Sequence, residues 1–245
     1  FSLSLKLGIF PKQWKIADVV ALHKKKSKSD PSNYRPISLL PIVSKIFEQI
    51  VNDQLSQFLA PKLNAHQFGF RAGHTTTDLL TLMSQSWKDA LAAGGEARAV
   101  ALDISKAFDR VWHDGLLHKL ESFGVSGSLL AWLRSFLSDR SQRVVVGDSG
   151  SSFLPIRAGV PQGSVLAPLL FLVFIDDLFD VVSNHLDVFA DDSTLWAIIP
   201  STSDRASVAK SLSDDLSAIA AWAKKWLVTF RENRSAHPPQ TPLHV

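Results

Sequence analysis

Two adjacent carboxylates, Asp191 and Asp192, stand between two runs of apolar and β-favouring residues in the segment LDVFADDSTLW, residues 186–196. Asp and Ser tolerate turn conformations, so the segment predicts a hairpin with the carboxylates at its tip. A simple turn would explain the pair, because short motifs of this kind are common. The pair could instead bind a hard cation such as Mg²⁺, which takes oxygen ligands and offsets the repulsion of like charges. A third carboxylate nearby would favour the metal site.

Asp103 is a candidate for this third carboxylate. It lies near the end of RAVALDI, residues 98–104, whose alternation predicts a strand with apolar side chains on one face and Asp103 among alanines on the other. If this strand pairs with the hairpin, Asp103 meets Asp191. Two Mg²⁺ ions about 4 Å apart can stabilise the attacking and leaving oxygens of a phosphoryl displacement. Nucleases, cyclases and polymerases all use carboxylate pairs, so spacing alone leaves the reaction open.

Length and composition limit the class of protein. The chain has 245 residues, 46% of them hydrophobic, which is enough for a substantial core in one domain. It has no Cys, which excludes disulfides, thiolate metal sites and a Cys nucleophile and favours an intracellular setting. The longest apolar run, Ser164–Ile175, is too short to span a bilayer and predicts a buried helix. The chain begins at Phe1 without a secretion signal, so we expect a non-secreted piece of a longer protein.

Charge is distributed unevenly along the chain. Residues 1–35 contain eight Lys or Arg and two Asp, whereas residues 100–200 contain seven basic and twelve acidic residues. A basic amino-terminal arm beside an acidic centre suits a protein that handles phosphates. The alternative is that the lysine-rich HKKKSKSD is a solvated loop.

The elements that must position the carboxylates follow from periodicity. Apolar residues recur at helical spacing in residues 42–60, and TTTD predicts a helix start in which Thr75 caps and Asp78 favours the first turn. Helices and hairpins do not alternate as in a parallel doubly wound sheet, which favours an α+β fold with an antiparallel sheet. The remaining expected helices cover residues 75–91, 115–123, 128–137, 168–182 and 204–226, and two further strands fall within residues 142–160.

Five segments resemble the reverse transcriptases of non-LTR (LINE-type) retrotransposons. They occur in that family's order over residues 14–226: SDPSNYRPISLLPIVSKIFEQI, HQFGFRAGHTTTDLL, AVALDISKAFDRVWHDGLLHKL, AGVPQGSVLAPLLFLVFIDDL and VFADDSTLW. The resemblance implies a right-hand polymerase with fingers and a ferredoxin-like antiparallel palm sheet. It also implies synthesis of DNA on an RNA template from a primer 3′-hydroxyl.

The same resemblance implies an organisation and a set of partners. We expect residues 1–100 to form a fingers region with the basic arm, 101–230 a palm with the metal site and interleaved fingers elements, and 231–245 an irregular tail. The thumb is expected to be missing. An RNA template, a DNA primer and dNTPs are the expected partners, without a membrane. An endonuclease module is expected elsewhere in a full-length protein of the nucleus or cytoplasm.

The resemblance also assigns roles to residues of the carboxylate site. Asp103, Asp191 and Asp192 become the catalytic residues and ligands of two Mg²⁺ ions, for which Mn²⁺ could substitute. Ile104 would offer its backbone carbonyl to a metal. Phe108 matches the steric gate whose ring crowds the 2′ position of a ribonucleotide, and without the motif it would be an ordinary core Phe.

Further roles concern the nucleotide. Gln162 and Gly163 in PQGS resemble the loop against the nascent base pair, where Gly permits close backbone approach. Lys24 and Arg35 match positions that bind the triphosphate. The ammonium of Lys acts as a point charge, and the planar guanidinium of Arg can donate two hydrogen bonds to phosphate oxygens. Lys25 or Lys26 could take the place of Lys24. Arg71 could contact either the template or a neighbouring carboxylate.

The chain departs from the family after residue 230. Arg234 stands where the family has a Lys proposed to donate a proton to pyrophosphate, and the Pro-rich tail cannot supply a central strand. Catalysis by this chain alone is therefore expected to be poor. Three hypotheses remain: a Mg²⁺-dependent RNA-directed DNA polymerase, an inactive retroelement remnant that folds and binds nucleic acid, and an unrelated two-metal nuclease. The nuclease leaves RPIS and PQGS unexplained.

Overall fold

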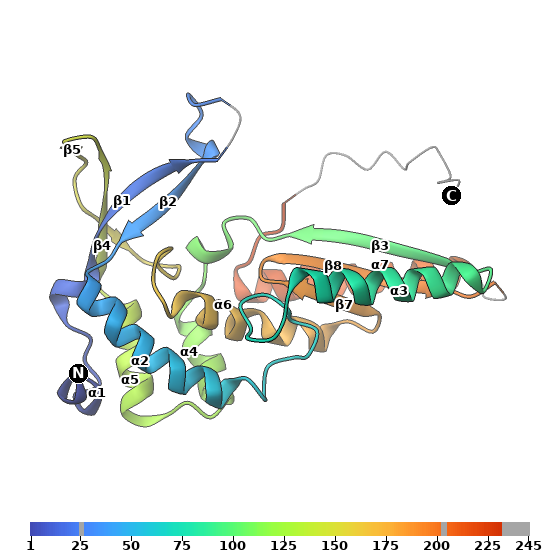
Figure 1. Cartoon of the computed structure of the whole chain (residues 1–245), viewed down its shortest axis with the longest axis horizontal. Helices are drawn as coiled ribbons and strands as arrows, with labels where there is room; N and C mark the ends of the chain where they lie inside the picture. The colour runs from blue at the N-terminus through green and yellow to red at the C-terminus, as the bar shows by residue number, and fades with distance from the viewer. Residues whose placement is uncertain (25–26, 202–204, 232–245) are drawn as a thin grey trace.

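The computed structural model describes residues 1–24, 27–201 and 205–231. Helices and strands form two groups, each built on one sheet (Figure 1). A five-stranded sheet and the helices near the N-terminus form one group, and a three-stranded antiparallel sheet with a long helix on each side forms the other. The predicted α+β class is confirmed.

The five-stranded sheet combines segments that are distant in the sequence. The strand order is β2-β1-β4-β5, and β6 also pairs with β4. β1 runs antiparallel to β2 but parallel to β4, so this sheet is mixed rather than purely antiparallel. Its strands are β1 (Ile16–His23), β2 (Tyr34–Leu39), β4 (Arg140–Val146), β5 (Ser149–Gly150) and β6 (Leu154–Ile156).

From Ile16 onward, the expected basic arm belongs to a β-hairpin in this sheet. The sequence analysis predicted neither β1 nor β2, although IADVVALH is rich in β-branched and apolar residues. The lysine-rich segment joins the two strands, and Lys24 donates its backbone N–H to Asn33 O at 2.9 Å. Lys25 and Lys26 lie outside the described residues.

Four helical segments pack beside this sheet: α1 (Ser2–Leu7), η1 (Lys12–Lys15), α2 (Ile42–Leu59) and α5 (Gly127–Leu137). Aromatic rings fill the space between them, with Phe10 set edge-on against Trp132 and Phe136. The bounds of α2 and α5 agree with the helices predicted from apolar spacing.

The three-stranded sheet has the order β3-β8-β7, formed by β3 (Glu96–Asp103), β8 (Asp192–Ile199) and β7 (His185–Phe189). Helix α3 (Thr76–Ala92) covers one face, where it packs on Trp196. Helix α7 (Arg205–Trp226) covers the other, in the cluster that contains Leu195. Thr75 and Asp78 form the predicted capping box at the start of α3. The predicted strand, hairpin and helices in this region are therefore confirmed.

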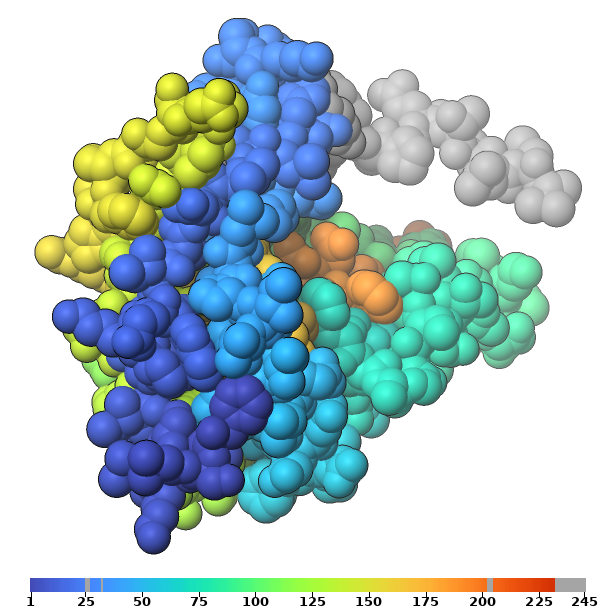
Figure 2. Space-filling model, turned by 60° about the vertical axis from the view of Figure 1, so that its left-hand side comes forward, coloured from blue at the N-terminus to red at the C-terminus, as the bar shows by residue number. Residues whose placement is uncertain are grey.

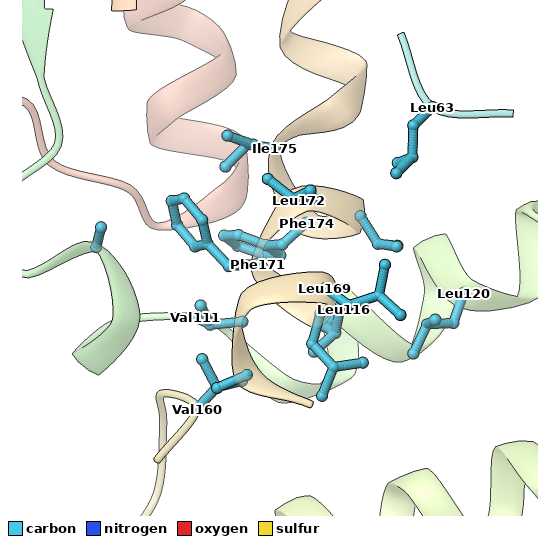
Figure 3. Close-up of a cluster of buried hydrophobic side chains, with 14 of the residues drawn as sticks. Leu63, Val111, Leu116, Leu120, Val160, Leu169, Phe171, Leu172, Phe174 and Ile175 are labelled. Atoms are coloured by element: carbon cyan, nitrogen blue, oxygen red, sulfur yellow. The ribbon is translucent and has the colours of Figure 1, made fainter. Parts of the chain in front are cut away.

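Helix α6 (Ala167–Ile175) occupies the centre of the molecule, and every residue of α6 except Pro168 is buried. Figure 3 shows its side chains meeting Val160, Leu63 and residues of α4 (His113–Ser122). The helix predicted to Val182 changes at Asp176 to the tighter 3₁₀ form, η4 (Asp176–Val181). Two other 3₁₀ turns are η2 (Pro31–Asn33) and η3 (Ala107–Asp109). Among the described residues, no helix is long and apolar enough to cross a membrane.

Candidate active site at the end of the three-stranded sheet

The β7–β8 hairpin turns through Ala190 and Asp191, and Asp192 is the first residue of β8. Asp192 lies directly opposite Asp103, the last residue of β3. Residues opposite each other in an antiparallel pair project from the same face of the sheet. The hairpin therefore brings Asp103 and Asp192 together, with Asp191 beside them in the turn.

The electrostatics of this end of the sheet reflect the crowding of acidic groups. Partial burial, and then the neighbouring charges of Asp192 and Asp103, raise the pKa of Asp191 above its ordinary value. Asp103 Oδ2 and Arg231 Nη1 form an ion pair at 3.0 Å. In the part of the chain that the structure describes, no three acidic or His side chains converge as a metal-binding cluster. The three carboxylates thus lie at one end of the sheet, but they do not form a preorganised metal-binding cluster.

A divalent cation fits this donor set chemically. Clustered carboxylates are the hard oxygen ligands that Mg²⁺ prefers, and a cation would offset both the burial and the repulsion that raise the pKa of Asp191. The backbone on both sides of Ile104 is hydrogen-bonded. Arg231 N donates to Asp103 O and Ser105 N donates to Thr229 O, both at 2.8 Å. Ile104 lies between these two bonds, and a metal contact of its carbonyl stays a prediction.

Phe108 lies within η3, between the core and the surface. Its ring stacks on Phe171 with centroids 4.9 Å apart and meets the edge of Phe70 at 5.9 Å. The side chain is only partly buried and packs against the main core. Its role as a steric gate stays a prediction, and the geometry accommodates both the gate and the core residue.

The PQGS loop connects β2 with η3. Gln162 Nε2 donates to Asp109 Oδ1 at 2.8 Å, and its backbone O accepts from Ser38 N of β2 at 2.7 Å. Gly163 has a φ of 121°, and a Cβ there would lie 2.5 Å from Ser38 O. Gly163 therefore packs closely against β2 of the same chain, and its approach to a nascent base pair stays a prediction.

Lys24 and Arg35 lie on the other sheet. Arg35 is opposite Leu22 in the β1–β2 pair, and both basic side chains are exposed. No ion pair between described residues joins either of them to the carboxylates. Figure 2 shows a hollow between the blue N-terminal elements and the turquoise α3, in which orange atoms of the β7–β8 region are visible. The basic hairpin and the carboxylates thus belong to separate parts of the molecule.

Sequence reasoning missed Glu48, whose side chain is fully buried on α2. Its carboxylate accepts from Ser44 Oγ at 2.8 Å and from Val165 N at 2.9 Å, and also from Ser164 Oγ. Glu48 thereby holds the end of the PQGS loop at Ser164 and Val165, whereas Asp109 binds Gln162. A charged residue within the apolar stripe of a helix was the signal that could have identified it.

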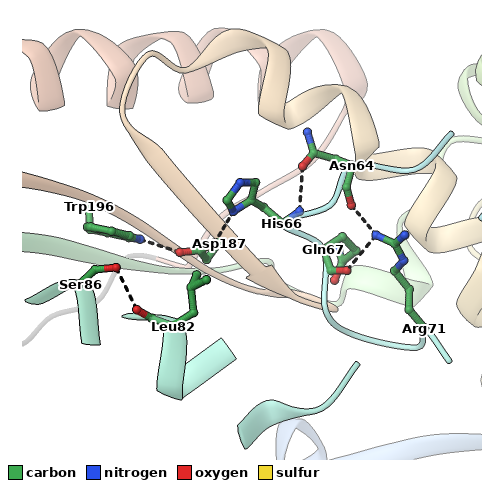
Figure 4. A network of polar contacts seen from close by, with 8 residues as sticks. All are labelled: Asn64, His66, Gln67, Arg71, Leu82, Ser86, Asp187 and Trp196. Atoms are coloured by element: carbon green, nitrogen blue, oxygen red, sulfur yellow. Dashed lines mark hydrogen bonds and ion pairs between the residues drawn. The ribbon is translucent and has the colours of Figure 1, made fainter. Parts of the chain in front are cut away.

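Of the two contacts considered for Arg71, the one with a neighbouring carboxylate is electrostatic: burial raises the pKa of Asp176, and the charge of Arg71 partly opposes this. Its contact with the template stays a prediction. Its guanidinium donates to the backbone carbonyls of Asn64 and Gln67 (Figure 4) and also to that of Ala60. Five guanidinium donors in a fixed fork can close such a loop. In the described structure Arg71 therefore holds the shape of the loop that precedes α3. Arg234, the other basic residue considered, lies outside the described residues.

Comparison with known proteins agrees with this geometry. The family described as "Reverse transcriptase (RNA-dependent DNA polymerase)" matches residues 23–238. The chain is 36% identical to the "Probable RNA-directed DNA polymerase from transposon BS" and 35% identical to the "RNA-directed DNA polymerase from mobile element jockey", both of Drosophila melanogaster. Each alignment covers 97% of this chain and 27% of the relative. The chain thus spans about a quarter of the length of these relatives.

A solved structure shows the same fold. Apo telomerase from Candida tropicalis, truncated from its C-terminal domain, superposes with a TM-score of 0.61 and 14% sequence identity. The superposition covers 94% of this chain and 52% of the telomerase chain, and it is consistent with the predicted polymerase fingers and palm. The retrotransposon-type motifs, the family match and the relatives all agree: the chain belongs to the reverse transcriptase (RNA-dependent DNA polymerase) family.

Proposed function

We propose that this chain is the fingers and palm of an RNA-directed DNA polymerase, which joins a dNTP to a primer 3′-hydroxyl on an RNA template. The observation that carries the proposal is the pairing of Asp103 with Asp192 beside the turn that contains Asp191. The chain spans about a quarter of its relatives. An endonuclease module in a longer protein is therefore also part of the proposal.

Asp103, Asp191 and Asp192 would hold two divalent ions, Mg²⁺ or Mn²⁺, with the carbonyl of Ile104 as a further ligand. When bound, the ions would lower the pKa of the primer hydroxyl and neutralise charge on the departing pyrophosphate. The carboxylates would orient the reacting groups. Burial raises the pKa of Asp191, and a bound cation would oppose this by favouring the ionised carboxylate. Arg231 would compete with a cation for Oδ2 of Asp103, whereas the ion pair leaves Oδ1 for a metal.

Nucleotide selection is assigned to residues around this site. Phe108 would exclude the ribose 2′-hydroxyl, and Gln162 and Gly163 would lie against the new base pair. Lys24 and Arg35 would grip the triphosphate from the β1–β2 hairpin. The division into fingers (1–100), palm (101–230) and tail (231–245) remains part of the proposal. The five-stranded sheet draws strands from both sides of residue 100, which is the interleaving that the division allows. Residues 232–245 lie outside the described structure.

The test is single-nucleotide incorporation by the 245-residue chain on a labelled DNA primer annealed to RNA, with Mg²⁺ or Mn²⁺. A single addition needs no processive synthesis. We expect one dNTP to be added, and Asp103→Asn or Asp191→Asn to reduce the rate by about a hundredfold or more, because metal ligation contributes several kcal/mol to such reactions. Asp89→Asn is the matched control, because Asp89 is exposed on α3 and bonds only locally, to Gln85.

Fluorescence anisotropy of the same primed RNA establishes that the complex is saturated. Saturated binding without any incorporation in either metal would contradict the proposal and identify a binding-only remnant. Shortened primers in place of extended ones would indicate a nuclease.

A further inference from the structure

The segment Gln67–Phe70 runs alongside the candidate catalytic hairpin. Phe68 N donates to Val188 O at 2.8 Å, and Val188 N donates to His66 O at 3.0 Å. These bonds form a parallel bridge between Gln67 and Val188, at the edge of β7. The segment therefore extends the three-stranded sheet on the side of the turn that contains Asp191.

Gln67 reaches that turn with its side chain. The residue is 1% exposed, and Gln67 Oε1 accepts from Gly69 N at 2.9 Å and from Ala190 N at 3.0 Å. Ala190 has a φ of 60°, a left-handed conformation that residues other than glycine rarely adopt. Such a conformation persists when surrounding contacts hold it. The buried bond from Ala190 N to Gln67 is one of those contacts, immediately before Asp191.

Gly69 supports the same turn by its lack of a side chain. A Cβ at Gly69 would lie 2.3 Å from Ala190 N and 2.9 Å from Ala190 Cα. Both are backbone atoms, so the turn itself would have to move. The next residue, Phe70, has a φ of 56° and places its ring edge against Phe108. One segment thus contacts both the carboxylate turn and the proposed gate.

The segment is itself held from behind (Figure 4). Arg71 binds the carbonyls of Asn64 and Gln67, and Asn64 N donates to Asp176 Oδ1 at 2.9 Å. His66 Nδ1 and buried Asp187 Oδ1 are 2.7 Å apart. These contacts tie the segment to η4 and β7, so Gln67 presents its amide oxygen from a fixed position.

We infer that Gln67 is a positioning residue, which holds the left-handed Ala190 turn and thereby sets how Asp191 is presented to divalent cations. The inference rests on the proposed function for its catalytic consequence. A local role for Gln67, closing its own turn through Gly69 N, would not require the second bond to Ala190, 123 residues away. Among the described residues, Gln67 Nε2 has no hydrogen-bond partner, so the acceptor oxygen alone carries this role.

Four variants of the 245-residue chain test the inference. Gln67→Met keeps the size of the side chain but removes the acceptor. Gln67→Glu keeps an acceptor oxygen in either protonation state. Gly69→Ala presses on the same turn from the other side, and Gln85→Met is the matched control, because Gln85 is exposed on α3 and bonds only to Asp89.

The first readout is thermal melting in a MgCl₂ titration without nucleic acid. The wild-type melting temperature should rise with Mg²⁺, because a ligand that binds only the folded state stabilises it. Gln67→Met and Gly69→Ala should need about 10- to 100-fold more Mg²⁺ for half of that rise, as is typical when a residue supporting a metal ligand is lost. Gln67→Glu should stay nearer to wild type than Gln67→Met, and Gln85→Met should be unchanged. The second readout is single-nucleotide incorporation. The Mg²⁺ concentration that gives half of the maximal rate should rise by a similar factor in the variants, while the dNTP concentration that gives half of the maximal rate should not change.

A folded Gln67→Met with the wild-type Mg²⁺ dependence would overturn the inference. The inference would also fail if the Mg²⁺-dependent rise in melting temperature fell in Gln67→Met and Gly69→Ala only in proportion to the loss of folded protein, measured by circular dichroism. If the wild type responds to Mg²⁺ in the melt but adds no nucleotide, the proposed function fails, while the melting shifts of the variants still decide the role of Gln67.

Discussion

The two sheets differ in how completely they are covered. In the three-stranded sheet, α3 and α7 enclose both faces of β8, where Leu195 is 0% and Trp196 3% exposed. In the five-stranded sheet, Val146 of β4 is 70% and Leu154 of β6 64% exposed. Strands with few buried contacts open locally at lower free energy than core strands do. The proposed metal ligands therefore lie on the better-supported sheet, and the proposed triphosphate grip on the more open one.

This difference matches two different tasks. Carboxylates that align reacting atoms must be held closely, since a misplacement of about 1 Å can cost a hundredfold in rate. A hairpin that meets a flexible triphosphate can tolerate more movement. Through Gln162 the PQGS loop joins β2 of the five-stranded sheet to η3, which follows β3: Gln162 bonds to Ser38 and to Asp109.

Identical truncations in the two sheets provide the most direct test of this contrast. Leu195→Ala should lower the free energy of unfolding by about 2–5 kcal/mol, because it opens a cavity between enclosed layers. Leu154→Ala, at an exposed position, should change it by less than about 0.5 kcal/mol. Urea denaturation followed by circular dichroism measures both. Similar losses in the two variants would contradict the difference in coverage.

Substitution of Glu48 tests how α2 supports the PQGS loop. Glu48→Ala removes the acceptor for Ser164 Oγ and Val165 N and should destabilise the fold by about 1–3 kcal/mol, the cost of leaving buried donors unpaired. Glu121→Ala, at an exposed position of α4, is the control. Adding Ser164→Ala to Glu48→Ala should cost less than the same change in the wild type. Strict additivity in this double-mutant cycle would show that the two side chains act independently.

The smallest expected effect concerns pH and His113, whose Nε2 lies 2.7 Å from Gly159 O at the start of the same loop. Burial lowers the pKa of His113, and the bond to Gly159 only partly opposes this. Its contribution to stability is therefore complete above the ordinary His pKa of about 6.5 and is lost as pH falls through the lowered folded value. His113→Gln should flatten the dependence of melting temperature on pH in that window, by a few degrees at most. Exposed His118→Gln is the control. An unchanged slope in His113→Gln would assign the dependence to another group.

The parts of the fold that sequence predicted are those whose signal is local. Apolar spacing identified α2 and α7, and the Thr75–Asp78 capping box identified the start of α3. The β1–β2 hairpin was missed because a lysine-rich run dominated that stretch, and because the parallel pairing of β1 with β4 is set by tertiary contacts. The change to 3₁₀ geometry at Asp176 has no local sequence signal either, and Asp176 accepts a hydrogen bond there from Asn64 N, which is distant in the sequence.

The site shows the same limit. Alternation and turn chemistry were sufficient to predict that Asp103 would meet the hairpin. They could not predict the Arg231–Asp103 ion pair, because Arg231 follows α7 and reaches Asp103 only through the bridge between Phe230 and Ile104. Gln67 and Glu48 were missed for a related reason, since each acts through partners more than a hundred residues away in the sequence.

The parallel pairing of β1 with β4 has a consequence for the order of events during synthesis. Asp18 and Arg143, which pair across these strands at 2.7 Å, are 125 residues apart. At about 5–20 residues per second, β1 leaves the ribosome roughly 6–25 s before its partner and waits with one edge open. Open strand edges invite wrong pairing, and a charged side chain on the edge discourages it. Asp18 places such a charge on the edge of β1, and in the folded chain Arg143 of β4 neutralises it.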